Sequence, residues 1–210
     1  MTIAKKISAG EAVTAGATGI CEGASLRTPC GARRVEFIRK GDLVVTRDNG
    51  LQAVRMVWTW TVTEAEMAAD PSLAPVLLEP RAIGPMMPQH TLRVGGAHRL
   101  LIPGWRLEDE DDSESCLVPA RDVDGVSLGS DAKVEDVVYY NVVFDESQVF
   151  CANGLPLESF APSVDALSHV PKDVQEQLRT EFSEFGPKFD DYPAPRYKKR
   201  QHVSYTPDYA

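Results

Sequence analysis

The chain has 210 residues, of which 43% are hydrophobic and 25% charged, so it is long enough for one sizeable core with tails. Its 22 basic and 31 acidic residues give a net charge of −9, which argues against nucleic-acid binding and weakly against an anionic membrane surface. The sequence shows neither a membrane-spanning run nor an N-terminal signal peptide. We therefore expect a protein without a transmembrane segment that is cytoplasmic, or exported without an N-terminal signal peptide.

The first elements, in chain order, are a leader and a β-rich stretch. Residues 1–20 lack periodicity and are interpreted as a flexible leader. Short apolar runs at 35–38 and 43–46 precede Asn49-Gly50, a pair typical of a tight hairpin turn because both residues adopt positive φ. The return strand is predicted over 52–62.

The tryptophans of that return strand stand at period two, which places Trp58 and Trp60 on one face, interpreted as core. Thr63 and Glu66 have the spacing of a capping box and predict a short helix that ends before Pro71. Further on, the acidic run at 108–114 lacks the ligand spacing of a calcium loop and is interpreted as a solvated loop.

The second half predicts another hairpin, a turn, a helix and a tail. Runs at 137–144 and 148–152 are interpreted as paired strands, with Asn153-Gly154 as the next turn. Apolar residues spaced by four predict a short amphipathic helix over 172–182. The last residues, 189–210, are rich in Pro and Tyr, contain a basic cluster at 196–200 and are interpreted as an extended, solvated tail.

Four cysteines stand at positions 21, 30, 116 and 151, with no Cys-x-x-Cys spacing. A zinc ribbon or a disulfide scaffold is therefore not expected, and reduced thiols are the simpler interpretation. No sequence motif for a metal or an organic cofactor is visible, so neither is predicted.

Three segments carry a family resemblance, and they occur in a fixed order: TGICEGASLRTPCG (18–31), LRVGGAHRLLIPG (92–104) and YYNVVFDESQVFCANGLPLESF (139–160). Together they resemble the bacterial form of the Hint module, the self-cleaving β fold shared by inteins and hedgehog proteins. The resemblance implies a mainly β Hint fold of pseudo-twofold hairpins over residues 21–162. A short C-terminal helix and an extended tail would then follow over 163–210.

The chemistry that the resemblance implies is attack by a Cys on the peptide before it, an N-to-S acyl shift. Cys21 matches the nucleophile, and cleavage would fall between Ile20 and Cys21. His98 matches the acid that protonates the departing nitrogen. Gly95 stands where relatives carry a Thr that helps to hold the oxyanion; backbone N–H groups of Gly96 or Ala97 would compensate. The stretch from Cys21 to Thr28-Pro29 is shorter than in relatives.

Two further residues are candidates for supporting roles. Asn141 stands where relatives often have a His, and an amide orients groups but does not shuttle protons. Cys151 is either a redox partner that approaches Cys21 across the fold or a buried spectator. Asn153 is followed by Gly154 and a long segment, so two-sided splicing is not expected.

Two main functions stay open on the sequence alone. The first is self-processing, in which the chain's own N-terminal leader is the substrate. The second is a catalytically degenerate Hint fold that binds an unknown protein partner or serves assembly. An enzyme acting on an external substrate is a third class, but no phosphate loop, metal triad or serine triad supports it.

Overall fold

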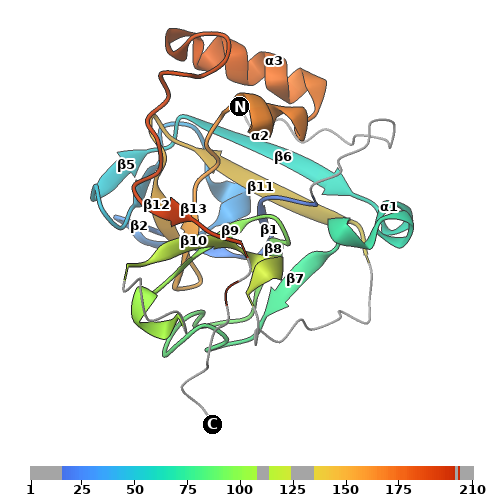
Figure 1. Cartoon of the computed structure of the whole chain (residues 1–210), viewed down its shortest axis with the longest axis vertical. Coiled ribbons are helices and arrows are strands. Elements are labelled where there is room, and N and C mark those ends of the chain that lie inside the picture. Colours follow the sequence, from blue (N-terminus) through green and yellow to red (C-terminus); the bar gives the residue numbers. More distant parts are fainter. Residues whose placement is uncertain (1–15, 108–113, 124–134, 202, 204–210) are drawn as a thin grey trace.

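The computed structural model describes residues 16–107, 114–123, 135–201 and 203. These residues form a mainly β structure, as the sequence predicts, with two large sheets and a group of helices beside one of them (Figure 1). Residues 1–15 of the predicted leader and residues 108–113 of the acidic run lie outside the described residues. In the described part of the chain, no helix has the length and apolar character needed to span a membrane.

The first sheet has five strands and places the start of the described chain at its centre. Its order is β6 (Met56–Val62), β11 (Val137–Val143), β1 (Ile20–Cys21), β8 (Leu92–Gly95) and β7 (Pro75–Leu78). The strands that pair with β1 are both antiparallel to it. Strand β1 is therefore held on both edges.

The second sheet has seven strands and contains the last strand of the described residues. Its order is β14 (Lys198–Lys199), β10 (Cys116–Pro119), β9 (Arg99–Ile102), β13 (Leu155–Glu158), β12 (Val149–Ala152), β2 (Ser25–Thr28) and β3 (Gly31–Arg34). A separate ribbon joins β4 (Leu43–Val45) to β5 (Leu51–Ala53).

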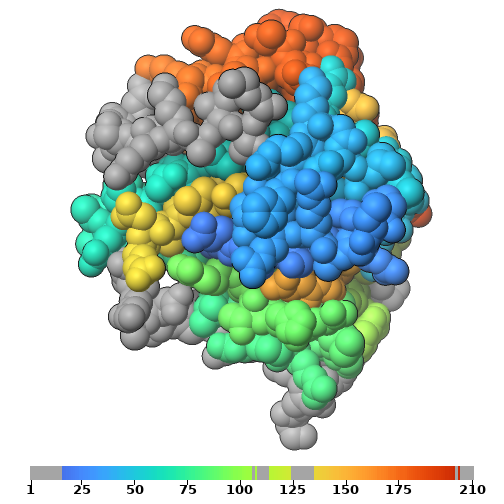
Figure 2. All heavy atoms as spheres, turned by 180° about the vertical axis from the view of Figure 1, so that it is seen from behind, coloured from blue at the N-terminus to red at the C-terminus, as the bar shows by residue number. Residues whose placement is uncertain are grey.

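The helices are short. The α-helices are α1 (Glu64–Ala69), α2 (Val164–Ser168) and α3 (Lys172–Glu181), and the 3-10 turns are η1 (Val35–Phe37), η2 (Pro71–Leu73), η3 (Gly104–Arg106), η4 (Ala120–Asp122) and η5 (Ser183–Phe185). Helices α2 and α3 lie at one end of the molecule, next to β6 (Figure 1). Seen from behind, residues of the first strands, in blue, cover much of one face, and the C-terminal helices, in orange, cap its end (Figure 2).

Several local predictions are confirmed. Strands β4 and β5 form the hairpin around Asn49-Gly50. Thr63 caps α1 through the predicted box, since its hydroxyl accepts the Glu66 N–H and the Glu66 carboxylate accepts the Thr63 N–H. At the turn between β12 and β13, Asn153 has φ 48° and Gly154 has φ 86°, which only a few residue types adopt readily. Helix α3 occupies 172–181.

Two strand predictions are wrong in their pairing. The return strand predicted over 52–62 is two strands: β5 pairs with β4, whereas β6 pairs with β11 in the five-stranded sheet. The second predicted hairpin does not form, because β11 and β12 lie in different sheets. In both cases the chain leaves one sheet for another within a few residues, and a strand's period-two pattern carries no information on its partner. Residues 35–37, predicted as part of an apolar strand, form η1.

Both ends of the described chain pack on the body. The predicted leader covers residues 1–20, yet Ile20 lies in β1 with 1% of its surface exposed. The predicted tail is extended, but Phe189 and Tyr192 are buried with Trp58 and Phe182 in an apolar cluster between β6, β11 and the helices. Burial of these large side chains opposes release of either end into solvent.

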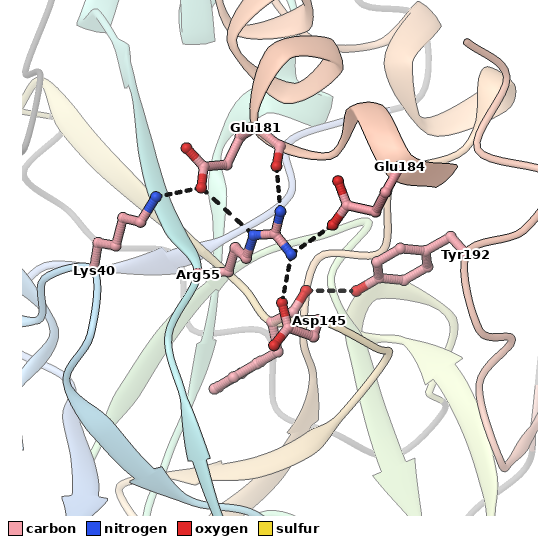
Figure 3. Close-up of polar contacts among 7 residues, drawn as sticks. Lys40, Arg55, Asp145, Glu181, Glu184 and Tyr192 are labelled. Atoms are coloured by element: carbon pink, nitrogen blue, oxygen red, sulfur yellow. Dashed lines mark hydrogen bonds and ion pairs between the residues drawn. The ribbon is translucent and has the colours of Figure 1, made fainter. Parts of the chain in front are cut away.

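A clasp of charged side chains fastens the C-terminal helices to the body (Figure 3). Arg55, which follows β5, pairs through Nη1 with Glu184 at 2.6 Å and with Asp145 at 2.8 Å. It also donates to the Glu181 carbonyl and lies over the Phe182 ring, 4.8 Å from the centroid. The hydrogen bonds to Asp145 and Glu184 raise the pKa of the Arg55 guanidinium above its usual range.

Candidate functional site

The candidate site is the channel through which the N-terminal segment, defined as residues 16–19, enters β1. Backbone groups hold this segment: the Gly95 N–H donates to the Gly19 carbonyl at 2.9 Å, and the Ala97 N–H donates to the Ala17 carbonyl at 2.9 Å. Ile20 then pairs with Val94 on one side and with Tyr140 on the other. The segment therefore continues a central strand rather than crossing a surface.

Gly95 is required by the closeness of this approach. A Cβ on Gly95 would lie 2.2 Å from the Ala17 carbonyl oxygen, a distance that no side chain tolerates. The sequence predicts that Gly95 stands in the place of a Thr. The N-terminal segment occupies the space that such a Thr would need. A Thr at position 95 and the segment in this position therefore exclude each other.

His98 follows β8 and directs its ring at the same segment. Its Nδ1 accepts the Gly19 N–H at 3.2 Å and lies 3.4 Å from the Thr18 Oγ1. Because Nδ1 accepts a hydrogen bond, the neutral ring carries its proton on Nε2, which is buried without a hydrogen-bond partner among the described residues. Burial, with a smaller contribution from Arg99, lowers the pKa of His98 to about 4, so the ring is neutral at pH 7.

Asn141, in β11, holds the other side of the same peptide. Its Nδ2 donates to the Thr18 carbonyl at 3.3 Å. Gly19 has φ 117°, and a Cβ there would lie 2.8 Å from this Nδ2, which is a second reason for glycine in the channel. Asn141 and His98 thus bind the two polar groups of the Thr18–Gly19 peptide. This peptide lies two residues before the predicted Ile20–Cys21 cleavage position.

Cys21 itself is buried in β1, with 1% of its surface exposed. Successive strand residues face opposite ways, so Ile20 enters one apolar cluster and Cys21 enters the other, with Trp60 and Tyr139. Burial, and next the neighbouring Cys21, raise the pKa of the Tyr139 hydroxyl. Such an apolar neighbourhood disfavours a thiolate.

The remaining predicted residues are placed differently. Gly96 accepts the Arg121 N–H through its carbonyl at 3.0 Å, and a Cβ would fit there without a clash. Cys151 lies in β12 of the other sheet, opposite Pro156, and burial raises the pKa of its thiol. Both interpretations of Cys151, as a redox partner of Cys21 or as a buried spectator, stay predictions. Among the described residues, no group of three His, Cys, Asp or Glu side chains is arranged to hold a metal ion.

A cavity of about 300 Å³ opens beside the N-terminal segment. Its lining includes Thr18, His98, Glu158 and Lys199. The site residues predicted from the sequence do not include Thr18, Glu158 or the C-terminal residue Lys199. The stretch between Cys21 and Thr28-Pro29 is shorter than in relatives. This spacing moves the position that matches the family's nucleophile from Cys21 toward Gly19, and it therefore indicates the neighbouring Thr18 as part of the site.

Comparisons with known proteins give a family match and distant structural similarities. The family model described as a Hint domain matches residues 18–164, about two thirds of the chain, and begins at Thr18. A search of curated proteins gives no match. Three similar solved structures are a variant of the MchDnaB-1 intein, the AceL NrdHF class 3 split intein and a bacterial intein-like domain from Clostridium thermocellum.

The similarity to these structures is distant in sequence. The MchDnaB-1 intein variant is 13% identical, with 67% of this chain and 99% of that chain covered, at a TM-score of 0.41. The split intein is 13% identical, with coverages of 68% and 97% and a TM-score of 0.41. The Clostridium thermocellum domain is 14% identical, with coverages of 69% and 99% and a TM-score of 0.38.

Proposed function

Since the chain belongs to the Hint domain family, we propose that it binds its own N-terminal segment in the position of a self-processing substrate and retains it uncut. The observation that carries this proposal is the bond from the Gly19 N–H to His98 Nδ1. In the chemistry of the family, the histidine protonates the nitrogen of the scissile peptide. The residue that contributes this nitrogen also carries the nucleophile. Here that residue is Gly19, which has no side chain.

The supporting groups are also arranged for binding rather than for cleavage. A leaving nitrogen needs a proton from the ring, but His98 is neutral at pH 7 and offers Gly19 a lone pair. The Ala97 N–H contacts the Ala17 carbonyl, one peptide before the one that Asn141 and His98 hold. The Ala97 donor therefore does not join Asn141 at the Thr18 carbonyl, where an oxyanion would form.

Self-processing at Ile20–Cys21 is the second candidate. The observation that favours it is the position of Cys21 in β1, two residues beyond the held peptide and within the family match. The thiol would attack the Ile20 carbonyl, and the acyl group would move from nitrogen to sulfur before water releases it. Burial of Cys21 beside Tyr139 opposes formation of the thiolate that this step needs.

The domain organisation is proposed on the same basis. A Hint body extends to about residue 162, followed by the C-terminal extension over 163–210; the end of the family match at residue 164 supports this boundary. At the other end, the contacts of residues 16–20 support their inclusion in the proposed body, so the proposed leader is shorter than the predicted residues 1–20.

The mass of the intact chain tests the choice between the two candidates. Purified protein is held for several days at pH 7, with and without dithiothreitol or hydroxylamine. We expect the full-length mass to persist under every condition, both in the wild type and in Cys21→Ala. Loss of residues 1–20 that thiol accelerates, and that Cys21→Ala prevents, would overturn retention and establish self-processing.

Hydrogen exchange tests the binding itself. The Gly95 and Ala97 amides report the seated segment, because both donate to it. We expect His98→Ala to increase exchange at these two amides, since it removes the acceptor of the Gly19 N–H. His169→Ala is the matched control, because His169 lines the same cavity and makes no contact with Gly19 that the structure records. Equal effects of the two variants would contradict the assignment of His98.

A further inference from the structure

The basic cluster that the sequence analysis assigned to a solvated tail is instead a strap across the body. We define the C-terminal strap as residues 196–201. Within it, β14 pairs in parallel with β10, with Lys198 opposite Cys116 and Lys199 opposite Leu117. The Arg200 N–H also donates to the Leu117 carbonyl at 2.9 Å. The strap thus extends the seven-stranded sheet at its edge.

A buried carboxylate anchors the middle of the strap. Glu158, at the end of β13, has a side chain that is 7% exposed. Its Oε1 lies 3.3 Å from Lys199 Nζ, and its Oε2 lies 3.4 Å from Arg99 Nη1. The contact with Lys199 is an ion pair without hydrogen-bond geometry. A carboxylate this deeply buried is costly without its cations, so Glu158 favours the closed position of the strap.

The strap makes other polar contacts as well. Tyr197 donates to Asp48 at 2.8 Å, while Arg196 lies 3.7 Å from Asp48. Lys198 lies 3.6 Å from Glu114, and both side chains are about 70% exposed (66% and 72%). Exposed pairs of this kind contribute little and are screened by salt. The Lys199–Glu158 pair differs from the Lys198–Glu114 pair because its carboxylate side chain is only 7% exposed.

The two ends of the described chain meet in one cavity. Gly16 and Thr18 of the N-terminal segment line it, as do Lys199 and Gln201 of the strap. His98, whose ring binds the segment, lines the same cavity. The N-terminal segment and the strap therefore share one cavity.

We propose that the C-terminal strap is an electrostatic latch that keeps the N-terminal segment in the His98 site. When Lys199 is bound to Glu158, the strap forms a wall of the cavity and the segment stays seated. When that pair is broken, the strap leaves β10, and the segment exchanges between seated and released states. The latch rests on the proposed retention of the segment, and it adds a regulated step to it.

Site-resolved hydrogen exchange of the full chain tests the latch. The wild type is compared with Lys199→Gln, with Tyr197→Phe and with Lys188→Gln, an exposed lysine before the strap, as the control. We expect Lys199→Gln to accelerate exchange of the Gly95 and Ala97 amides by about tenfold or more, and Tyr197→Phe by a smaller factor. The amides of β6 should keep wild-type rates, and Lys188→Gln should change nothing.

The outcomes separate the latch from the proposed function. Unchanged Gly95 and Ala97 rates in Lys199→Gln, or a uniform acceleration that includes β6, would overturn the latch. Fast exchange of both amides already in the wild type, together with a shortened mass, would overturn retention instead. If the exchange rates of the Gly95 and Ala97 amides rise from low salt to 1 M NaCl in the wild type but not in Lys199→Gln, the latch is supported, because salt then acts through the Lys199 pair. An equal increase in both proteins would count against it.

Discussion

The two ends of the described chain are fastened to the same body by different kinds of bond. The N-terminal segment is bound through main-chain groups and two uncharged side chains, His98 and Asn141. The C-terminal extension adds ion pairs, at Arg55 and at Lys199, to its apolar contacts and to the pairing of β14 with β10. The first mode requires close backbone approach and burial, whereas the second tolerates partial exposure and responds to salt. Permanent seating suits the first mode and reversible docking suits the second.

The difference also explains where glycine is needed. Gly95 and Gly19 stand in the N-terminal channel because a Cβ at either position would meet backbone or amide atoms. At the Arg55 clasp, long flexible side chains bridge the distance instead, and the Phe182 ring supports the guanidinium. Side chains of this length accommodate small displacements that the N-terminal channel does not.

The largest expected effect breaks the N-terminal mode directly. Gly95→Thr places a Cβ within 2.2 Å of the Ala17 carbonyl oxygen, and we expect it to destabilise the fold by more than about 3 kcal/mol or to eject the segment. Gly96→Ala is the matched control, since its nearest neighbour would be the Arg121 Cβ at 3.5 Å. Urea unfolding measures both variants. Equal stability of the two would contradict the close approach described for Gly95.

The next effect concerns pH and should be specific to the N-terminal site. The unfolded chain protonates His98 below about pH 6.5, whereas the folded chain does so only below about pH 4. The unfolded state therefore binds the proton first. This contribution to stability is fully present above pH 6.5 and is lost as the pH falls toward 4, by at most about 3 kcal/mol.

Urea unfolding between pH 4.5 and 7.5 measures this contribution. We expect His98→Gln to flatten the slope of stability against pH, while the acceptor oxygen of Gln still serves the Gly19 N–H. An unchanged slope in His98→Gln would show that the imidazole is solvated rather than buried.

The smallest effect sharpens the C-terminal side of the comparison. Arg55→Met keeps apolar contact with Phe182 but removes the pairs with Asp145 and Glu184, and we expect a loss of about 1–2 kcal/mol at low salt. The difference from wild type should shrink in 1 M NaCl. Arg33→Met removes only a pair with Asp42 at 3.2 Å on a half-exposed side chain, and its effect should stay below about 0.5 kcal/mol. Thermal unfolding at two salt concentrations distinguishes them.

The sequence predicts the structure correctly where interactions between residues close in the chain decide it. The capping box at Thr63, the positive-φ turn at Asn153-Gly154 and the period of α3 each depend on residues a few positions apart. Partner choice was not readable in this way. The runs at 137–143 and 149–152 are strands, but each pairs with residues about 80 or more positions away, or with the following strand, rather than with one another.

The candidate site shows the same division. The sequence alone determined the mainly β class, the family resemblance, and His98 and Asn141 as residues of interest. Only the tertiary structure decided that both side chains meet the Thr18–Gly19 peptide and that Cys21 enters an apolar cluster. The physical reason is that residue type limits what a side chain is able to do. Which peptide it contacts is set by strand pairing across the whole chain, and this pairing places the N-terminal segment at a cavity that the C-terminal strap also lines.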